Sequence, residues 1–249
     1  MLAWFTMAED DAPGAADLLL AGLARDLAAR GAAIAGAVQH NRDLGPDRPC
    51  DMEIELVGAQ APRIRISQSL GPGAQGCRLD PGALETAAAR VLPALEAARL
   101  VIVPKFARQE AVGRGFVAVI ARAMELELPV LTYVPRQQAA AFADFAGDLA
   151  RRIAPAEAAT WAQARLAPEV DARDLLCPLP VLRLRKALAD VAPGDMVRLL
   201  ATDGMAAVDL PHFCAEQGHA MIARHDLAQG VMEFTVARGP ARPLPTELT

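Results

Sequence analysis

Apolar and polar positions along residues 1–146 form patterns that predict strands and helices in alternation. Apolar runs at residues 2–7, 34–38, 100–103 and 130–134 predict buried strands, and helical spacing predicts helices at 16–30, 80–96, 115–127 and 137–146. The second of these helices has a well-defined start, because Asp80 suits an N-cap and Pro81 the first helical position. The alternation predicts an α/β domain with three layers, in which helices cover both faces of a mostly parallel sheet.

Two further segments of this domain have a different periodicity. Apolar and charged residues alternate strictly at 52–56 and again at 63–66. A period of two is typical of strands with one buried and one solvated face. The turn-forming segment at 58–62 joins them, so we expect an antiparallel hairpin.

After residue 146 the pattern changes twice. Residues 147–168 are rich in Ala and Arg and contain Gly147, Pro155 and Pro168, which predicts a linker with a short helix around Trp161. From residue 169 the chain predicts a strand, a helix at 178–191, a strand at 196–201, a helix at 206–217, and strands at 221–225 and 231–236. This β-α-β-α-β-β order over residues 169–239 predicts a two-layer α/β sandwich with a four-stranded sheet, and residues 240–249 a loose tail.

Composition narrows the classes of protein that this chain can represent. The 249 residues are enough for two modest domains, and a net charge of −5 with mixed signs argues against a general nucleic-acid binder. No run approaches the roughly 18 apolar residues of a membrane span, and residues 1–11 lack the features of a secretory signal. We therefore expect no membrane contact and a cytoplasmic location, where all four cysteines stay reduced.

The tetrapeptide Cys177-Pro178-Leu179-Pro180 is the main candidate for chemistry. Pro178 suits the first turn of a helix, and Pro180 stiffens that turn while leaving backbone N–H groups near the sulfur. A helix N-terminus can lower the pKa of a cysteine from about 8.5 to between ~3.5 and ~7.5, and only the thiolate attacks disulfides and persulfides. The motif therefore predicts a nucleophilic thiol, against the alternative of an inert buried cysteine.

Residues 169–239 resemble the TusA/SirA family of small sulfur-carrier proteins. The resemblance rests on the Cys-Pro-x-Pro motif at a helix start and on Asp171, residues 193–195, Asp203, residues 209–211, 213–214 and 218–219. It implies that Cys177 accepts a sulfur atom as a persulfide from a donor protein, such as a cysteine desulfurase, and passes it to an acceptor protein. No cofactor is implied.

One residue departs from the family's pattern. The family usually has glycine three residues before the cysteine, and this chain has Asp174. Asp tolerates the left-handed backbone region better than most residues, so we expect the turn to persist. Its negative charge beside the thiolate would oppose a low pKa of Cys177.

Other charged and metal-binding residue types in this domain have simpler interpretations. The basic residues Arg183, Arg185 and Lys186 either dock an acidic partner or form a solvated helix face. Cys214 lies in an apolar helix, and its spacing to His212 and His219 fits no standard zinc pattern. We expect Cys214 to pack in the core, and we predict no metal site.

Two segments of the first domain suggest anion binding. Residues 71–76 match a glycine-rich dinucleotide fingerprint, but the helix starts only at Asp80 and no acidic residue follows at the required place. The remaining alternatives are a surface turn or a loop that binds an anion, with candidate residues Ser67, Ser69, Gly71, Gly73, Gly76 and Arg78. A second candidate set, Lys105, Arg108 and Arg114, follows the strand at 100–103, where the carboxyl end of a buried strand lines a ligand crevice.

Residues 1–146 also resemble an uncharacterised bacterial family that looks like a degenerate P-loop NTPase. The shared stretches are residues 36–39, 50–52, 67–73, 76–80 and 105–106 with Glu110. Acidic residues 9–11 occupy the place of the phosphate loop, so NTP hydrolysis is disfavoured. The resemblance implies a link with molybdenum metabolism. Cys50 and Cys77 lie beside charged residues and are interpreted as packing or loop residues.

Together these features predict a sulfurtransferase that carries a persulfide on Cys177. The specific hypothesis is sulfur delivery for the molybdenum cofactor or a molybdoenzyme, with the first domain selecting the recipient pathway or a small anionic ligand. The alternative is a regulator without catalysis, in which the first domain senses an oxyanion or nucleotide and the second is a docking module. Asp174 favours the alternative, because its charge opposes thiolate formation.

Overall fold

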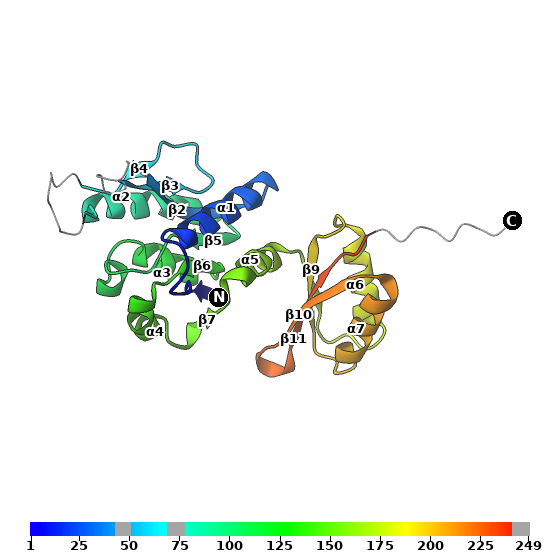
Figure 1. Cartoon of the computed structure of the whole chain (residues 1–249). Coiled ribbons are helices and arrows are strands. Elements are labelled where there is room, and N and C mark those ends of the chain that lie inside the picture. The colour runs from blue at the N-terminus through cyan, green and yellow to red at the C-terminus, as the bar shows by residue number, and fades with distance from the viewer. Residues whose placement is uncertain (43–50, 69–77, 241–249) are drawn as a thin grey trace. The chain divides into compact units, whose positions relative to one another are not determined.

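The computed structural model describes residues 1–42, 51–68 and 78–240. The chain forms two compact units, Met1–Arg165 and Leu166–Thr249, each with its own sheet and helices (Figure 1). Within the described ranges, no helix has the length and apolar character needed to cross a membrane.

The first unit is built on a seven-stranded sheet with the order β4-β3-β2-β5-β6-β1-β7. Strands β2, β5, β6, β1 and β7 are parallel, whereas β3 and β4 pair antiparallel beside β2. The strands are β1 (Leu2–Phe5), β2 (Ile34–Arg42), β3 (Asp51–Leu56), β4 (Ile64–Arg65), β5 (Leu100–Val103), β6 (Val130–Tyr133) and β7 (Ala150–Arg152). The predictions of a mostly parallel sheet and an antiparallel hairpin are confirmed.

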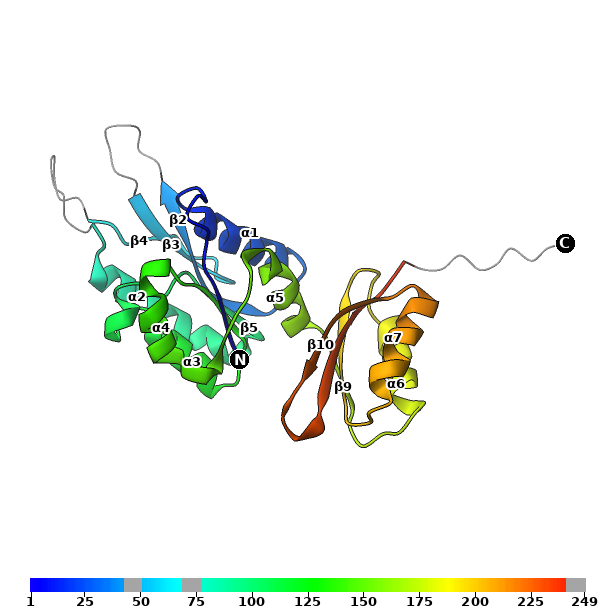
Figure 2. The same cartoon turned by 60° about the horizontal axis from the view of Figure 1, so that its bottom comes forward.

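Helices cover both faces of this sheet, as predicted. Helices α2, α3 and α4 lie on one face, and α1 and α5 lie on the other (Figure 2). The α-helices are α1 (Ala15–Ala29), α2 (Pro81–Val91), α3 (Val117–Glu125), α4 (Ala139–Ala146) and α5 (Ala158–Leu166). Short 3₁₀ turns are η1 (Leu92–Ala97), η2 (Glu110–Val112), η3 (Arg136–Gln138), η4 (Gly147–Leu149) and η5 (Pro155–Glu157).

Helix α2 shows how the local sequence sets an element's ends. The Asp80 carboxylate accepts a hydrogen bond from the Ala83 N–H at 3.0 Å, so the predicted N-cap is confirmed. The α-helix stops at Val91 instead of continuing to residue 96. Pro93 lacks an N–H for the next α-helical hydrogen bond, and the chain continues as the 3₁₀ turn η1.

The segment predicted to be a linker contains the short helix expected around Trp161, but most of it belongs to the first unit. Strand β7 (Ala150–Arg152) pairs with β1, and helix α5 (Ala158–Leu166) buries Trp161. The first compact unit accordingly extends to Arg165. The linker prediction rested on Pro, Gly and Arg content, but two of the three β7 residues are exposed arginines at a sheet edge, where polar side chains are tolerated.

The second unit has the predicted β-α-β-α-β-β order and a four-stranded sheet. Strand order is β10-β11-β9-β8, in which only β8 and β9 are parallel. Its elements are β8 (Glu169–Ala172), α6 (Leu179–Ala189), β9 (Met196–Ala201), α7 (Ala206–Gln217), β10 (Ala220–Asp226), η6 (Ala228–Gly230) and β11 (Met232–Ala237).

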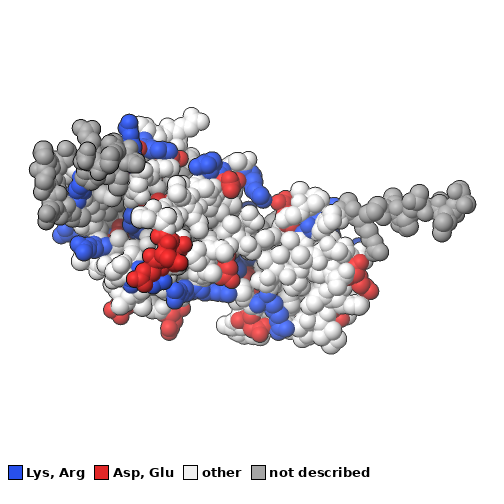
Figure 3. Space-filling view, viewed as in Figure 1, with Lys and Arg blue, Asp and Glu red and all other residues white. Residues whose placement is uncertain are grey.

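Both helices of this unit lie on the same face of its sheet (Figure 1). Leu184 and Leu188 of α6 and Leu210 of α7 are buried against Leu199 of β9 and Phe234 of β11. The two-layer sandwich predicted from the sequence is therefore confirmed. On the surface shown in Figure 3, acidic and basic side chains are interspersed, in keeping with the mixed charge of the sequence.

Candidate functional site

The Cys177 loop connects β8 to α6 and is anchored to the end of β9. The Asp174 N–H donates a hydrogen bond to Thr202 Oγ1 at 2.8 Å, and the Cys177 N–H donates to Asp203 Oδ2 at 2.8 Å. Asp174 has a φ of 60°, so the left-handed turn expected in place of the family's glycine is present. Two backbone donors on the loop thus hold the cysteine at a defined place beside the residues that follow β9.

The start of the loop is held by a second set of bonds around Asp171. Its carboxylate accepts hydrogen bonds from the Arg173 guanidinium at 2.9 and 2.7 Å and from the Arg173 N–H at 3.0 Å. These bonds hold the pKa of Asp171 well below its usual range. Arg183 of α6 donates to the Asp171 carbonyl at 3.1 Å, so one of the three basic residues of that helix supports the loop.

Helix α6 begins at Leu179, one residue later than predicted. Pro178 occupies the N-cap position, and Pro180 is the second helical residue, where its missing N–H has no helical partner to lose. The peptide bond between Cys177 and Pro178 is cis. Cys177 lies just before the helix and is exposed, while Pro180 is buried.

The pKa of Cys177 differs from the sequence-based expectation. We expected a low pKa from the helix N-terminus, but the pKa is raised above its ordinary value. The main cause is a hydrogen bond with the Asp209 carboxylate on α7, followed by desolvation and by the negative charges of Asp209 and Asp203. The carboxylates that oppose thiolate formation thus come from α7 and the loop before it, whereas the sequence had suggested Asp174 for this effect.

Exposed apolar side chains are clustered in the sequence around the thiol and its two carboxylates. They are Leu176, Leu179 and Leu182 beside Cys177 in the chain, and Met205 and Val208 beside Asp203 and Asp209. We call these five residues the apolar rim. Because Cys177 contacts both Asp203 and Asp209, the rim residues from the two segments are brought to the same part of the second unit. These five residues have no distinguishing signal in the sequence, since each resembles an ordinary core residue.

Cys214 and the two histidines near it have structural roles. Cys214 is buried in the core of the second unit, and burial raises its pKa to about 11. His212 pairs with Glu216 one turn later, and His219 Nδ1 accepts a hydrogen bond from the Gly239 N–H at 3.0 Å. The prediction that Cys214 packs in the core is confirmed.

The glycine-rich candidate anion site is only partly described. Ser69, Gly71, Gly73 and Gly76, together with Cys50 and Cys77, lie outside the described residues. The two remaining candidates, Ser67 and Arg78, both contact Asp51. Ser67 Oγ donates to Asp51 at 3.0 Å, and Arg78 lies 3.4 Å from the same oxygen. Their polar groups therefore bind a carboxylate of the chain itself.

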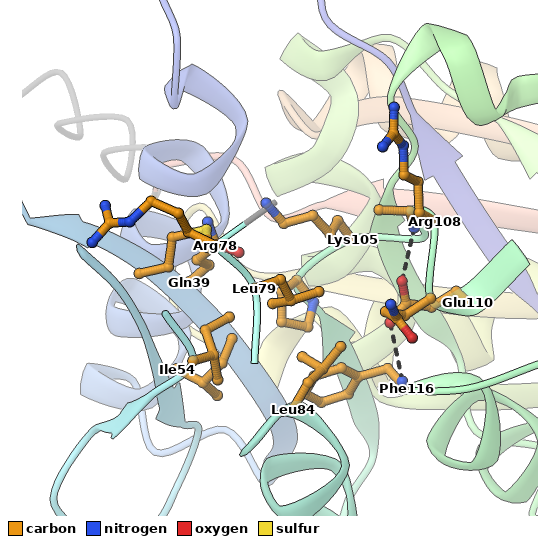
Figure 4. A pocket seen from close by; sticks show the side chains of 14 residues that line it. Gln39, Ile54, Arg78, Leu79, Leu84, Lys105, Arg108, Glu110 and Phe116 are labelled. Atoms are coloured by element: carbon orange, nitrogen blue, oxygen red, sulfur yellow. Dashed lines mark hydrogen bonds between the residues drawn. The ribbon is translucent and has the colours of Figure 1, made fainter. Parts of the chain in front are cut away.

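The second candidate set is divided by the structure. Lys105 and Arg108 follow β5 and, with Arg78, line a cavity of about 210 Å³, whereas Arg114 does not line it (Figure 4). Lys105 Nζ lies 3.9 Å from the carboxylate of Asp17 in the first turn of α1. The cavity also includes Gln39 from the carboxyl-terminal half of β2, the end of the sheet at which α/β proteins bind ligands.

At the N-terminus of α1, where a P-loop protein would bind phosphate, this chain has the buried carboxylate of Asp17. This carboxylate is 8% exposed and accepts a hydrogen bond from Asn41 Nδ2 at 2.6 Å. The N-terminus of α1 thus has an internal carboxylate as its neighbour, which repels a phosphate group. Asp17 and Asn41 were not identified from the sequence, because their pairing across 24 positions has no local signal.

Comparisons with known proteins match both units. The family described as "Protein of unknown function (DUF2478)" matches residues 5–162, and the family "Sulfurtransferase TusA" matches residues 168–238. A relative named "Molybdenum import ATP-binding protein ModC 2", from Bradyrhizobium diazoefficiens, is 37% identical over 135 residues, which is 53% of this chain. This chain spans 15% of the length of that relative.

Two smaller proteins are similar to the second unit. "Sulfur carrier protein TusA" of Pseudomonas paraeruginosa is 37% identical over 59 residues, which cover 24% of this chain and 75% of the relative. The crystal structure of a SirA-like protein from Desulfitobacterium hafniense has 29% identity and a TM-score of 0.27, and covers 29% of this chain and 97% of that protein.

Proposed function

This chain belongs to the family described as "Protein of unknown function (DUF2478)" and carries a TusA-like sulfurtransferase domain, and from this premise we propose that Cys177 carries sulfur as a persulfide. The observation that carries the proposal is an exposed thiol on an anchored loop at the start of α6, inside the matched domain. We place this activity inside the cell, where thiols stay reduced between transfers.

The transfer needs no cofactor. The Cys177 thiolate attacks the outer sulfur of a persulfide on a donor protein, the donor's S–S bond breaks, and the donor cysteine leaves as a thiolate. Cys177 then holds a persulfide, whose outer sulfur is transferred in the same way to a nucleophile on an acceptor. Before the attack the thiol loses its proton to solvent, and the hydrogen bond and negative charge of Asp209 oppose this loss in the free protein.

The apolar rim supports docking of protein partners rather than a small substrate. Five large apolar side chains are exposed near a reactive group, and Leu176 is 72% and Val208 62% exposed. Apolar side chains that stay exposed together on a protein surface commonly mark an interaction site. Arg185 and Lys186 are exposed on α6 and add positive charge for an acidic partner surface. The proposed partners are a donor such as a cysteine desulfurase and a sulfur-accepting protein.

Persulfide loading is tested by intact mass. The full chain is incubated with a cysteine desulfurase and cysteine, and the wild type should gain a sulfur adduct of ~32 Da. Cys177→Ser should gain none at this site. Cys214→Ser is the matched control and should load normally, because Cys214 is buried and is not needed for transfer. No adduct on the wild type, or an equal adduct on Cys177→Ser, would rule out the proposal.

For the acceptor, we propose the molybdenum cofactor or a molybdoenzyme. The support is the similarity to a protein named for molybdenum import, which extends over more residues than the second unit contains. Chain loaded with ³⁵S on Cys177 should transfer the label to a molybdoenzyme that lacks its sulfido ligand. If the label does not reach the molybdoenzyme but passes to a different sulfur acceptor, sulfur carriage stands and the molybdenum assignment fails.

The raised pKa of Cys177 favours a second candidate function. A protonated thiol is a poor nucleophile, so the second unit would act as a docking module and the first unit as a sensor of a small ligand. In that case the mass experiment yields no adduct although the protein binds a desulfurase. Loading of wild type but not Cys177→Ser excludes this candidate.

A further inference from the structure

The cavity beside Lys105 in the first unit has no role in the sulfur chemistry of Cys177. Its volume of about 210 Å³ is below the ~300–1,000 Å³ of sites for drug-sized ligands. It opens at the end of the sheet where β5 continues into residues 104–110. The size and position are those of a site for a small molecule.

The walls of the cavity are mostly apolar. Figure 4 shows Ile54, Leu84 and Phe116 at one end, with Glu110 beside Phe116, and Leu79 nearer to Lys105. Ile54 and Phe116 are 0% and 1% exposed, so they form part of the core and hold their positions. An apolar surface provides no hydrogen-bond donor, and its burial is favourable only against an apolar ligand surface. The body of the ligand is therefore apolar.

The opposite end of the cavity is positively charged. Three cations line it, and two of them have acidic neighbours, since Lys105 lies near Asp17 and Arg78 near Asp51. Arg108 is exposed and makes no ion pair with any residue in the described ranges. The charge of Arg108 is therefore not offset by an ion pair within the described ranges, and it suits one negative charge on the ligand.

The buried carboxyl of Glu110 disfavours a ligand with more negative charge. It lines the cavity, is 4% exposed, and accepts hydrogen bonds from the Ala107 N–H at 2.9 Å and the Phe116 N–H at 3.2 Å (Figure 4). Both oxygens are thus occupied by the backbone. A bare dianion such as molybdate would meet an apolar wall and an acidic side chain in this cavity, and it would find few free donors.

We propose that this cavity binds a small monoanionic molecule with an apolar body, such as an aromatic carboxylate. The apolar body lies against Met52, Leu79 and Leu84, which keep accessible surface in the cavity, and the anionic group lies at Lys105 and Arg108. This ligand class replaces the bare oxyanion that Lys105, Arg108 and Arg114 suggested in the sequence.

Two matched probes test the proposal in the full chain by isothermal titration calorimetry. The probes are 2-naphthoate, which is anionic, and 2-naphthamide, which is neutral and similar in size. We expect both to bind at one site, with 2-naphthoate bound at least roughly fivefold more tightly because of its charge. Sodium molybdate, measured in parallel, should show no binding at the same site.

Variants locate the binding. Leu84→Trp should fill the cavity and abolish binding of both probes, whereas Arg108→Gln should lower the affinity only for 2-naphthoate. Arg90→Gln, an exposed arginine of α2 that does not line the cavity, is the control and should bind as the wild type does. If Leu84→Trp does not fold, Arg108→Gln remains the test, because Arg108 is exposed and its loss should lower the affinity for 2-naphthoate alone.

Several results would overturn the proposal. They are no binding of either probe to the folded wild type, equal affinity for the two probes, unchanged binding by Leu84→Trp, and binding of molybdate in place of 2-naphthoate. None of these results depends on Cys177, so the persulfide experiment stands or fails separately.

Discussion

At the level of single residues, two opposing effects act on the pKa of the Cys177 thiol. It lies just before a helix, where the backbone N–H groups favour a thiolate, but Asp209 and Asp203 favour the protonated thiol. The net pKa is raised, so most of the thiol is protonated at neutral pH. A protonated thiol resists oxidation, because the thiolate is the form that oxidants attack.

Asp209→Asn should make Cys177 more reactive. The substitution removes the negative charge and the hydrogen bond that favour the thiol, so the pKa of Cys177 falls and alkylation by iodoacetamide at neutral pH accelerates roughly threefold to tenfold. The pH dependence of the alkylation rate should shift to lower pH. Glu216→Gln, on the last turn of α7, is the control and should leave the rate unchanged. An unchanged midpoint in Asp209→Asn would contradict the role of Asp209.

Asp174 and Asp209 show how far a single position can be interpreted from sequence. The left-handed turn at Asp174 could be predicted, because it depends on the backbone preference of one residue type. The carboxylate that raises the pKa of the thiol could not be predicted, since Asp209 is 32 positions away and reaches Cys177 only when α7 packs beside α6.

Among the elements, η2 and α3 depend on one buried carboxylate. Glu110 accepts the N–H groups of Ala107 and Phe116, the residues that precede η2 and α3. Burial raises the pKa of Glu110, because the charged form is partly removed from water. Gly115 is required beside it, as a Cβ there would lie 2.3 Å from Glu110 Oε1. The side chain therefore holds the whole segment that borders the cavity.

Glu110→Ala should destabilise the first unit by about 2 kcal/mol. The change leaves two backbone N–H donors without their acceptor, and an unsatisfied buried donor costs about 1–3 kcal/mol. Urea unfolding of the full chain measures the effect. Glu125→Ala removes an exposed carboxylate that pairs with Arg122 and should change stability by less than about 0.5 kcal/mol. Equal effects of the two substitutions would show that Glu110 has no structural role.

Elements with strong local signals were predicted well. The buried run of β5 and the N-cap of α2 needed no information from distant residues. Strand β7 has no such signal, because its three residues include two exposed arginines. Its strand conformation depends on pairing with β1, which is more than 140 positions earlier, and composition alone therefore suggested a linker.

At the scale of the molecule, each of the two units has a hydrophobic core of its own among the described residues. Leu95 is fully buried in the core of the first unit, and Leu184 is fully buried in the core of the second. The boundary lies between Arg165 and Leu166. Two cores of this kind are expected to unfold as separate cooperative units.

Calorimetry of matched leucine variants tests this independence. Leu184→Ala should lower the free energy of unfolding of the second unit by about 2–5 kcal/mol, which calorimetry records as a lower transition temperature for that unit. The transition of the first unit should stay in place. Leu95→Ala removes the same atoms from the first core and should have the converse effect. If either variant lowers both transitions equally, the two units unfold together and the prediction is wrong.

For this protein, the sequence by itself determined the alternation of elements, the two fold classes and the position of the exposed thiol. These depend on periodicity and on the preferences of Pro, Gly and Asp, which act over a few residues. Only the tertiary structure decided which carboxylates contact Cys177 and which charges line the cavity in the first unit. Such contacts join residues tens of positions apart, and their strength depends on burial and distance, which exist only after the chain has packed.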